Sequence, residues 1–330
     1  MSTATEASPR ADAAWARQAE RSNATMLRLM RWIAVALGRR TACVVLHPIS
    51  LYFLLFGGPA ARASTAFLAR ALGRRPRWRE RYAHIHQFAT SILDRVYLLR
   101  GDFQLFEVDV VGAEHLDHVL QAGRGAFLVG AHLGSFEALR ALGEERRGLD
   151  VAMLMYEQQS RRLEDTLRAI APEARQKIIG LGRLEAMLEL RDWLDAGGVA
   201  GLLADRSLHA TGEGQSRRSR THWVDFLGQP AAFSDGAFRL AALLRRPVVF
   251  MAGLSVGDAR YQLRFAPLAD FSAPVSREDT ELAVQQALLR YVRMLEAHCR
   301  ETPRNWYNFF DFWAGSPGPQ DTVHASAPPS

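Results

Sequence analysis

The chain has 330 residues, which is enough for one large domain or two small ones with a substantial buried core. Its 48% hydrophobic and 23% charged residues are ordinary for a globular protein, and its two distant cysteines, Cys43 and Cys299, exclude a disulfide scaffold and a cysteine-rich zinc site. The formal net charge of +6 comes from basic residues that are nearly all arginine, so the surface can meet nucleic acid, anionic lipid or an acidic carrier protein. Net charge alone does not separate these partners.

The two ends of the chain differ in composition from the rest. The N-terminal segment is polar, carries both signs of charge, and lacks the apolar core and cleavage site of a signal peptide. The C-terminal segment is rich in Pro, Ser and Ala. These features predict four regions: a disordered polar tail over 1–22, a helical membrane-associated region over 23–100, an α/β domain over 101–314, and a disordered tail over 315–330.

A helical pattern begins at Met26. Hydrophobic residues at 3.6-residue spacing form one stripe, and arginines form the opposite one; they are Met26, Leu29, Met30, Ile33 and Leu37 against Arg28, Arg31 and Arg39. A basic amphipathic helix suits an anionic membrane surface. The same pattern is equally typical of a helix packed on its own domain with solvated arginines.

The next segment, Thr41–Phe56, is apolar and has no formal charge, but His47-Pro48 interrupts it. It is short for a membrane-spanning helix, and a proline breaks or kinks a helix, so we expect it to dip into the bilayer or form an apolar platform. Five arginines then lie beside Trp78 within Gly73–Arg81. Apolar segments flanked by Arg and Trp favour a membrane interface, so the region is predicted to bind a membrane.

From Phe103 onward, strand patterns alternate with helix patterns. Strands are expected at Phe106–Val111, Ala126–Gly130, Val199–Ala204, Trp223–Leu227, Pro247–Ala252 and Tyr261–Ala266, and helices from about Phe136, at Leu184–Leu194, from about Asp235 to Leu244 and from about Arg277 to Cys299. This alternation predicts an α/β fold with a central, mostly parallel mixed sheet flanked by helices.

The segment Gly125–Leu142 carries the clearest chemistry. A buried strand delivers His132 to its carboxyl end, Gly134 allows a sharp turn, and Ser135 is a suitable N-cap for a helix that carries Glu137. The turn can fold the carboxylate back onto the imidazole, which fixes its tautomer and leaves the other ring nitrogen to take a proton. On its own, a His five residues before a Glu is also typical of a histidine at a strand end and a glutamate at a helix N-terminus.

Four ordered motifs resemble those of the lysophospholipid acyltransferase superfamily, within it the branch of lipid A biosynthesis lauroyl/myristoyl acyltransferases. The resemblance covers about residues 25–314, and the motifs are HLGSFE from His132 to Glu137, LLADRS from Leu202 to Ser207, VDFLGQPA from Val224 to Ala231, and PRNWYNFFDFW from Pro303 to Trp313. The resemblance implies a glycerol-3-phosphate-acyltransferase-like fold and direct transfer of a fatty-acyl group from acyl-ACP, or acyl-CoA, to a hydroxyl, or less often an amine, of a membrane lipid.

The resemblance also implies roles for single residues. His132 acts as general base, Glu137 orients it, and the developing oxyanion is held by backbone N–H groups near Gly134 and a nearby arginine. The predicted substrate-binding set is Gly134, Ser135, Phe136, Arg183, Asp205 and Arg206. No cofactor or metal is required, the expected partners are acyl carrier protein, a lipid acceptor and a membrane surface, and the expected location is the cytoplasmic face of a bacterial inner membrane.

Three departures concern the acceptor and the acyl chain. Phe233 stands where the lipid A enzymes usually have Thr, Trp306-Tyr-Asn-Phe-Phe replaces a Trp-x-His followed by basic residues, and Arg183 matches the family's arginine only approximately. With these departures the chain resembles family relatives that are linked to aryl-polyene or ornithine-type lipids. Acceptor identity and acyl-chain length stay open.

Other readings of the sequence make competing predictions. Gly253-Leu-Ser255-Val-Gly257 matches the nucleophile elbow of a serine hydrolase, but a strand is expected to follow it instead of a helix. The QSRRSR segment, 215–220, is short and belongs to no nucleic-acid-binding module, so no nucleic-acid partner is expected. The His84/His86 and His115/His118 pairs are interpreted as structural. A catalytically silent membrane scaffold or acyl-carrier docking module is the remaining alternative.

Overall fold

The computed structural model describes residues 23–139, 151–156, 177–206, 220–273 and 276–316. The two predicted tails, apart from Gly315 and Ser316, and most of the QSRRSR segment lie outside these residues.

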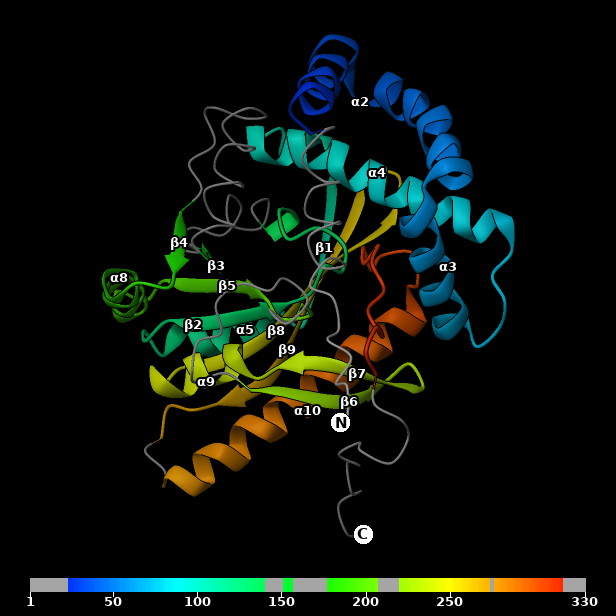
Figure 1. The fold of residues 1–330 in the computed structure, drawn as a ribbon. Coiled ribbons are helices and arrows are strands. Elements are labelled where there is room, and N and C mark those ends of the chain that lie inside the picture. Colours follow the sequence, from blue (N-terminus) through cyan, green and yellow to red (C-terminus); the bar gives the residue numbers. More distant parts are fainter. Residues whose placement is uncertain (1–22, 140–150, 157–176, 207–219, 274–275, 317–330) are drawn as a thin grey trace, which may run out of the picture.

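A seven-stranded sheet forms the centre of the described part of the chain (Figure 1). Every neighbouring pair of strands is parallel except β8 and β9, which are antiparallel. The predicted α/β fold with a mostly parallel mixed sheet is therefore confirmed. In spatial order the strands are β1 (Glu107–Val111), β9 (Arg260–Asp270), β8 (Pro247–Gly257), β2 (Ala126–Gly130), β5 (Val199–Leu203), β3 (Val151–Tyr156) and β4 (Ile178–Leu181).

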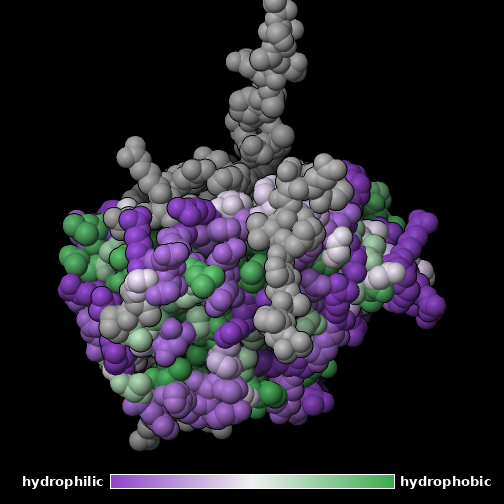
Figure 2. All heavy atoms as spheres, turned by 90° about the horizontal axis from the view of Figure 1, so that it is seen from below, coloured by the Kyte–Doolittle hydropathy of each residue, from purple (hydrophilic) through white to green (hydrophobic). Residues whose placement is uncertain are grey.

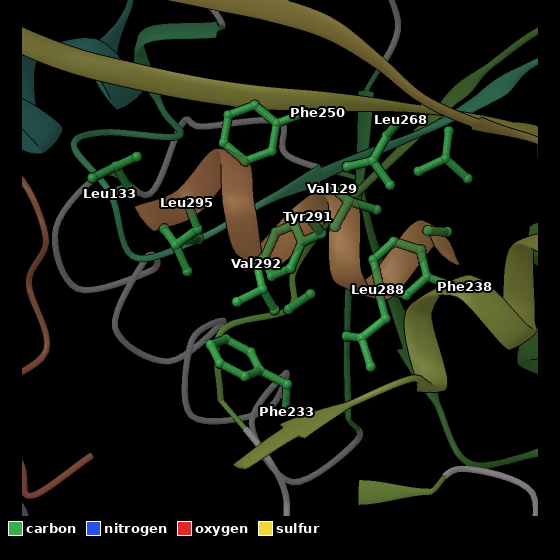
Figure 3. Packing of buried hydrophobic residues seen from close by; sticks show 14 of the residues in the cluster. Val129, Leu133, Phe233, Phe238, Phe250, Leu268, Leu288, Tyr291, Val292 and Leu295 are labelled. Atoms are coloured by element: carbon green, nitrogen blue, oxygen red, sulfur yellow. The ribbon is translucent and has the colours of Figure 1, made fainter. Parts of the chain in front are cut away.

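One hydrophobic core joins the sheet to the C-terminal helix α10 (Arg277–Glu301). Figure 3 shows Tyr291 of this helix among aliphatic and aromatic side chains that include Val129 and Phe250. The Tyr291 hydroxyl donates to the carbonyl of Gly130, the last residue of β2, at 2.9 Å. Core packing therefore also fixes the carboxyl end of the central strand. Further helices are η1 (Phe103–Leu105), α5 (Ala113–Gln121), α8 (Leu184–Asp195) and α9 (Gly236–Leu243).

Three N-terminal helices, α2 (Asn23–Phe56), α3 (Gly58–Leu72) and α4 (Trp78–Arg100), cover one side of the sheet (Figure 1). The helical assignment of α2 continues through Pro48, and the break lies at Gly38, whose φ of 73° and ψ of 165° are not helical. Glycine adopts this left-handed φ without a steric penalty, which explains why the break falls there.

The break at Gly38 corrects one part of the predicted amphipathic pattern. Arg39 begins a new direction of the chain, and its guanidinium is buried against Asp94 of α4 at 2.8 Å, with Asp258 at 2.6 Å. It does not lie on an exposed basic stripe. Tyr261 of β9 also donates to Asp94, at 2.8 Å, so this carboxylate ties α2 and α4 to the sheet.

A two-stranded hairpin of β6 (Thr221–Phe226) and β7 (Gln229–Ser234) packs against α10. The sequence pattern predicts only its first strand. Leu227 and Gly228 form the two-residue turn, and both have positive φ, 53° and 80°. The signal is weak because a leucine seldom occupies such a position.

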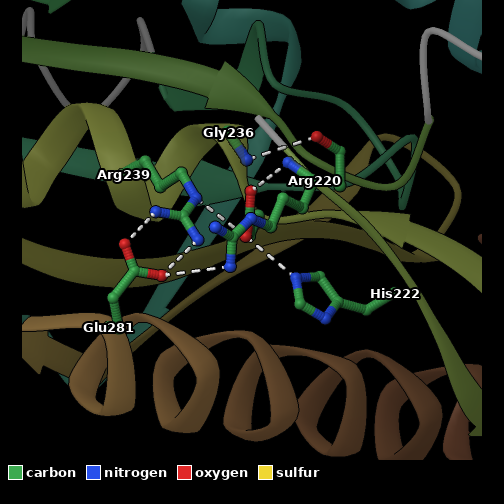
Figure 4. Close-up of polar contacts among 7 residues, drawn as sticks. Arg220, His222, Gly236, Arg239 and Glu281 are labelled. Carbon is green, nitrogen blue, oxygen red and sulfur yellow. Dashed lines mark hydrogen bonds and ion pairs between the residues drawn. The ribbon is translucent and has the colours of Figure 1, made fainter. Parts of the chain in front are cut away.

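A cluster of charged side chains anchors the end of this hairpin (Figure 4). Asp235 is fully buried and accepts hydrogen bonds from the His222 ring at 2.8 Å, the Arg220 N–H at 2.7 Å and the Arg239 guanidinium at 2.9 Å. Arg239 also forms two bonds to Glu281 of α10. The carboxylate of Asp235 thus holds β6, α9 and α10 together.

No single helix among the described residues is both long enough and apolar enough to cross a membrane. The helices Gly38–Phe56 and Gly58–Leu72 meet that test only as a pair, and the chain bends by 90° between them.

Replacing Asp235 by Ala should lower the free energy of unfolding by about 2–4 kcal/mol, because it removes a buried anion and leaves three donors without their partner. Chemical denaturation followed by circular dichroism measures this loss. Glu281→Gln is the matched control, since that side chain is 39% exposed and its replacement should change stability much less. Equal effects for the two variants would contradict the assigned role of Asp235.

Candidate active site

Two neighbouring parallel strands bring a histidine and an aspartate together. In the register of β2 and β5, Gly130 lies beside Leu203, and both are the last residues of their strands. His132 follows the first and Asp205 the second, each after one alanine. Because parallel strands end at the same edge of a sheet, these two side chains meet there.

Asp205 is fully buried and surrounded by hydrogen-bond donors. Its carboxylate contacts Nδ1 of His132 at 2.8 Å, the backbone N–H of His132 at 3.1 Å and the indole Nε1–H of Trp306 at 3.0 Å. Burial alone would raise the pKa of Asp205, but the adjacent His132 and Arg206 hold it below its ordinary value. Asp205 is therefore an anion at neutral pH, and an anion can only accept hydrogen bonds.

This environment fixes the protonation state of His132. Since Asp205 only accepts, Nδ1 carries the proton and donates it to the carboxylate. Burial, the largest effect, lowers the pKa of His132 below its ordinary value, although Asp205 acts in the opposite direction. The ring is therefore neutral at pH 7, and Nε2, to which no described residue is hydrogen bonded, holds a lone pair. The side chain is 30% exposed. These are the properties of a general base.

The closing segment around Trp306 supports the backbone that carries His132. The Gly134 N–H donates to the Asn305 carbonyl at 2.7 Å, and the Tyr307 N–H donates to the His132 carbonyl at 2.7 Å. Gly134 has a φ of 74° and lies so close to β8 that a Cβ would stand 1.9 Å from the Gly253 carbonyl oxygen. Only glycine fits at this crossing.

The same contacts correct one expectation. Backbone N–H groups near Gly134 are expected to bind an oxyanion, but those of Gly134 and Ser135 already donate to carbonyls, that of Ser135 to Gly253 at 2.7 Å. Their hydrogen-bonding capacity supports the turn.

Glu137 does not contact His132 among the described residues. Its carboxylate forms an ion pair with Arg95 of α4 at 2.8 Å and accepts a hydrogen bond from the Ser135 hydroxyl at 3.1 Å. The position on Nδ1 that the sequence predicts for Glu137 is occupied by Asp205. Because Glu137 lies in a turn and is buried, its carboxylate meets Arg95 and Ser135 instead of the His132 ring.

Of the remaining expected residues, Arg206 and Phe136 lie near Asp205 or its strand β5, and Arg183 lies far from them. Arg206 is adjacent to Asp205, and its guanidinium lies 5.5 Å from the centre of the Phe310 ring. The Phe136 ring packs against Gly201 of β5, where it fills the space of a side chain. Arg183 stands at the start of α8, after edge strand β4. Since β4 is three strands from β2, that end of the sheet is about 14 Å away.

Alternative sites find little support in the structure. Ser255 lies within β8, paired with Tyr261 of β9, so the strand–turn–helix of a nucleophile elbow is absent at that position. Among the described residues, no group of three or more His, Cys, Asp or Glu side chains is placed to hold a metal.

Sequence reasoning underestimates His84, which is fully buried on α4. Its Nε2 lies 2.9 Å from the Trp306 carbonyl oxygen and its Nδ1 lies 2.8 Å from the Ser64 hydroxyl of α3. A carbonyl only accepts, so Nε2 carries the proton and Nδ1 accepts from Ser64. Burial lowers the pKa of His84 to about 4, which keeps this tautomer neutral at physiological pH.

A family model described as "Bacterial lipid A biosynthesis acyltransferase" matches residues 30–313. Among solved structures, the chain is similar to the 1-acyl-sn-glycerophosphate acyltransferase PlsC of Thermotoga maritima, with 15% identity and a TM-score of 0.34, covering 83% of this chain and 97% of that one. No curated protein sequence matches.

The depressed pKa of His84 predicts a pH-dependent stability. In the unfolded chain His84 is protonated below about pH 6.5, whereas in the folded protein it is protonated only below about pH 4. The free energy of unfolding therefore falls as the pH is lowered from 6.5 to 4. The full loss of unfolding free energy across this window is about 3 kcal/mol. Unfolding free energies of the wild type and His84→Gln, measured between pH 7 and pH 4, test this, because glutamine keeps a donor and an acceptor without titrating. The variant should lose less stability across the window, and parallel curves would contradict the assignment.

Proposed function

Because the chain belongs to the bacterial lipid A biosynthesis acyltransferase family, we propose that its acyltransferase reaction moves a fatty-acyl group from a thioester donor to a hydroxyl of a membrane lipid, with His132 as general base. The observation that carries this proposal is the hydrogen bond between Asp205 and Nδ1 of His132, which leaves Nε2 as an acceptor at a partly exposed position.

The proposed reaction needs no covalent enzyme intermediate. Nε2 of His132 takes the proton of the acceptor hydroxyl while the oxygen attacks the thioester carbonyl carbon. The new C–O bond forms, the C–S bond breaks, and the imidazolium returns the proton to the departing thiolate. Asp205 stays ionised and stabilises the imidazolium, as the buried carboxylate does in a serine protease triad.

Arg206 is the best placed group for the charge on the oxyanion. Its positive charge is among the causes that lower the pKa of His132, after burial and together with Arg95, which indicates that it acts across the same site. Arg206 is itself exposed, so it would stabilise the oxyanion less than a cation in a site without water. The role proposed for Glu137 is different from orientation of the ring: it holds Arg95 and the turn after His132.

The donor and the acceptor follow from the family and from the departures in its closing motif. Acyl-ACP is the proposed donor, with acyl-CoA as a substitute. At the position where the lipid A enzymes have basic residues, this chain has Phe309 and Phe310, both half-buried. An acceptor with fewer phosphate groups than a lipid A precursor fits such a motif, because aromatic side chains do not pair with phosphate.

We also propose that the enzyme works on a membrane surface. The last two turns of α2 expose Tyr52, Phe53 and Phe56 to 59%, 48% and 70%. In contrast, the opposite face of the molecule, seen from below in Figure 2, is mostly hydrophilic, and its hydrophobic residues are scattered. A contiguous exposed apolar surface on one side is typical of an interfacial helix. The exposed arginines between α3 and α4 add attraction to anionic lipids.

Substitutions at the His132 site should distinguish the roles of the two carboxylates, Asp205 and Glu137. His132→Ala and Asp205→Asn should each reduce kcat by about a thousandfold or more, since the first removes the base and the second favours the wrong tautomer. Glu137→Gln should cost less, about ten- to a hundredfold, because it weakens only the support of the turn. Transfer of labelled acyl groups from acyl-ACP into a membrane-lipid extract measures all three.

In the same assay, wild-type kcat/KM should rise with pH through a value below 6.5, where His132 of the free enzyme loses its proton. Ser255→Ala, a change in the middle of β8, serves as the matched control and should keep wild-type activity. An active His132→Ala enzyme would overturn the proposal. A folded Glu137→Gln enzyme as inactive as His132→Ala, beside an active Asp205→Asn enzyme, would return the orienting role to Glu137.

Membrane binding should depend on the exposed end of α2. Replacing Tyr52, Phe53 and Phe56 together by Ser should weaken binding to vesicles of phosphatidylethanolamine and phosphatidylglycerol by about ten- to a hundredfold. Sedimentation with the vesicles measures this. The control replaces Leu243 and Leu282, which are 59% and 55% exposed on α9 and α10, and should bind normally. Equal loss for both variants would contradict a specific contact through α2.

A further inference from the structure

His84 belongs to a line of buried groups, joined by hydrogen bonds, that leads from Ser64 to His132. The Ser64 hydroxyl donates to His84, His84 donates to the Trp306 carbonyl, the Trp306 indole donates to Asp205, and Asp205 accepts from His132. All the members between the two ends are fully buried. The proposed function uses only the last contact of this line.

We propose that His84 is a positioning residue for acyl transfer: by fixing the peptide group of Trp306, it sets where the indole N–H holds Asp205 and therefore where Nε2 of His132 stands. This inference rests on the proposed function, because it assigns His132 and Asp205 to the chemistry.

Trp306 is suited to transmit a position because its side chain has little freedom. The indole ring is fully buried and lies in edge-to-face contact with Phe67 at 4.7 Å, Phe312 at 4.9 Å and Phe226 at 5.4 Å between ring centres. These rings come from α3, the closing segment and β6. The aromatic contacts fix the plane of the indole, and the bond from His84 fixes the backbone from which the ring projects.

The backbone next to Trp306 has a second effect on the site. The Tyr307 N–H binds the His132 carbonyl and the Asn305 carbonyl binds the Gly134 N–H, so the peptide groups on both sides of Trp306 hold the segment that carries the histidine. A shift of the Trp306 peptide therefore displaces both members of the pair. Misplacement of a general base by about 1 Å is enough to reduce a rate by about a hundredfold.

The line also begins in the two helices whose connecting arginines we propose to attract anionic lipids. Ser64 lies on α3 and His84 on α4, and neither helix supplies an atom to the proposed proton transfer. The N-terminal helices are thus coupled to the site through His84, which predicts that the geometry of their packing affects kcat more than donor binding.

Three variants test the role of His84. His84→Phe keeps a ring of similar size and removes both hydrogen bonds, so kcat should fall about tenfold or more while KM for acyl-ACP changes less than about twofold. His84→Gln keeps a donor and an acceptor and should recover kcat to within about threefold of wild type. His86→Phe, two residues away on the same helix and half-buried, is the matched control and should be unchanged.

A second measurement is independent of activity. Hydrogen exchange of the Trp306 indole N–H, followed by NMR on the full-length protein and assigned with Trp306→Phe, should be about tenfold faster in His84→Phe and near wild type in His84→Gln. Should His84→Phe fail to fold, Ser64→Ala removes only the support of the imidazole and should shift both readouts in the same direction, by less.

The outcomes separate this inference from the proposed function. A wild-type enzyme that transfers no acyl group overturns the proposed function and, with it, the role of His84. If the wild type is active but folded His84→Phe keeps its kcat, or changes only KM, or leaves exchange of the Trp306 indole unaltered, the positioning role is overturned while the acyltransferase proposal stands.

Discussion

The buried carboxylate of Asp205 is the constraint on which the rest of the site depends. An unpaired anion in the interior costs several kcal/mol, so the protein must surround it with donors that have no other partner. Three are present: two come from His132 and one from the Trp306 indole. Meeting this requirement fixes the tautomer of the histidine and the position of the closing segment at the same time. The lone pair on Nε2, which we propose to be reactive, is thus a consequence of satisfying a buried charge.

The fold brings this carboxylate to His132 because the two residues follow neighbouring strands at the same distance from the strand ends. Neighbouring parallel strands that end in register place whatever follows them side by side, and β2 and β5 are both followed by an alanine and then a polar residue. The Gly130 carbonyl accepts hydrogen bonds from the Tyr291 hydroxyl of α10 and from the Ala204 N–H. The end of the central strand therefore carries no unsatisfied group that would draw His132 away from Asp205.

The sequence predicts five of the seven strands of the sheet and the position of His132, because buried parallel strands have continuous apolar runs and a turn glycine marks the end of β2. It does not predict strands β3 and β4. It predicts the partner of His132 poorly. Glu137 is close along the chain, whereas Asp205 lies 73 residues away, and only the order of strands in space makes them neighbours. The second strand of the hairpin and the break at Gly38 escape prediction for a similar reason: Leu227 adopts a positive φ because the β6–β7 pairing requires it, and the buried pair of Arg39 and Asp94 sets the direction of α2.

The closing segment connects the chemistry to the choice of acceptor. Within a few residues it supplies the indole N–H to Asp205, the backbone contacts to the His132 turn and the aromatic ring under Arg206. Asn308, in the same segment, is buried, and neither atom of its amide has a hydrogen-bond partner among the described residues. The residues that hold the proposed general base are under a strict geometric constraint, whereas Asn308 and Phe309 carry none of those contacts and are free to differ from the lipid A enzymes. In the proposed mechanism a single short segment can therefore keep the reaction constant while the acceptor changes, since the departures within the closing motif fall after Trp306 and leave the Asp205 contact intact.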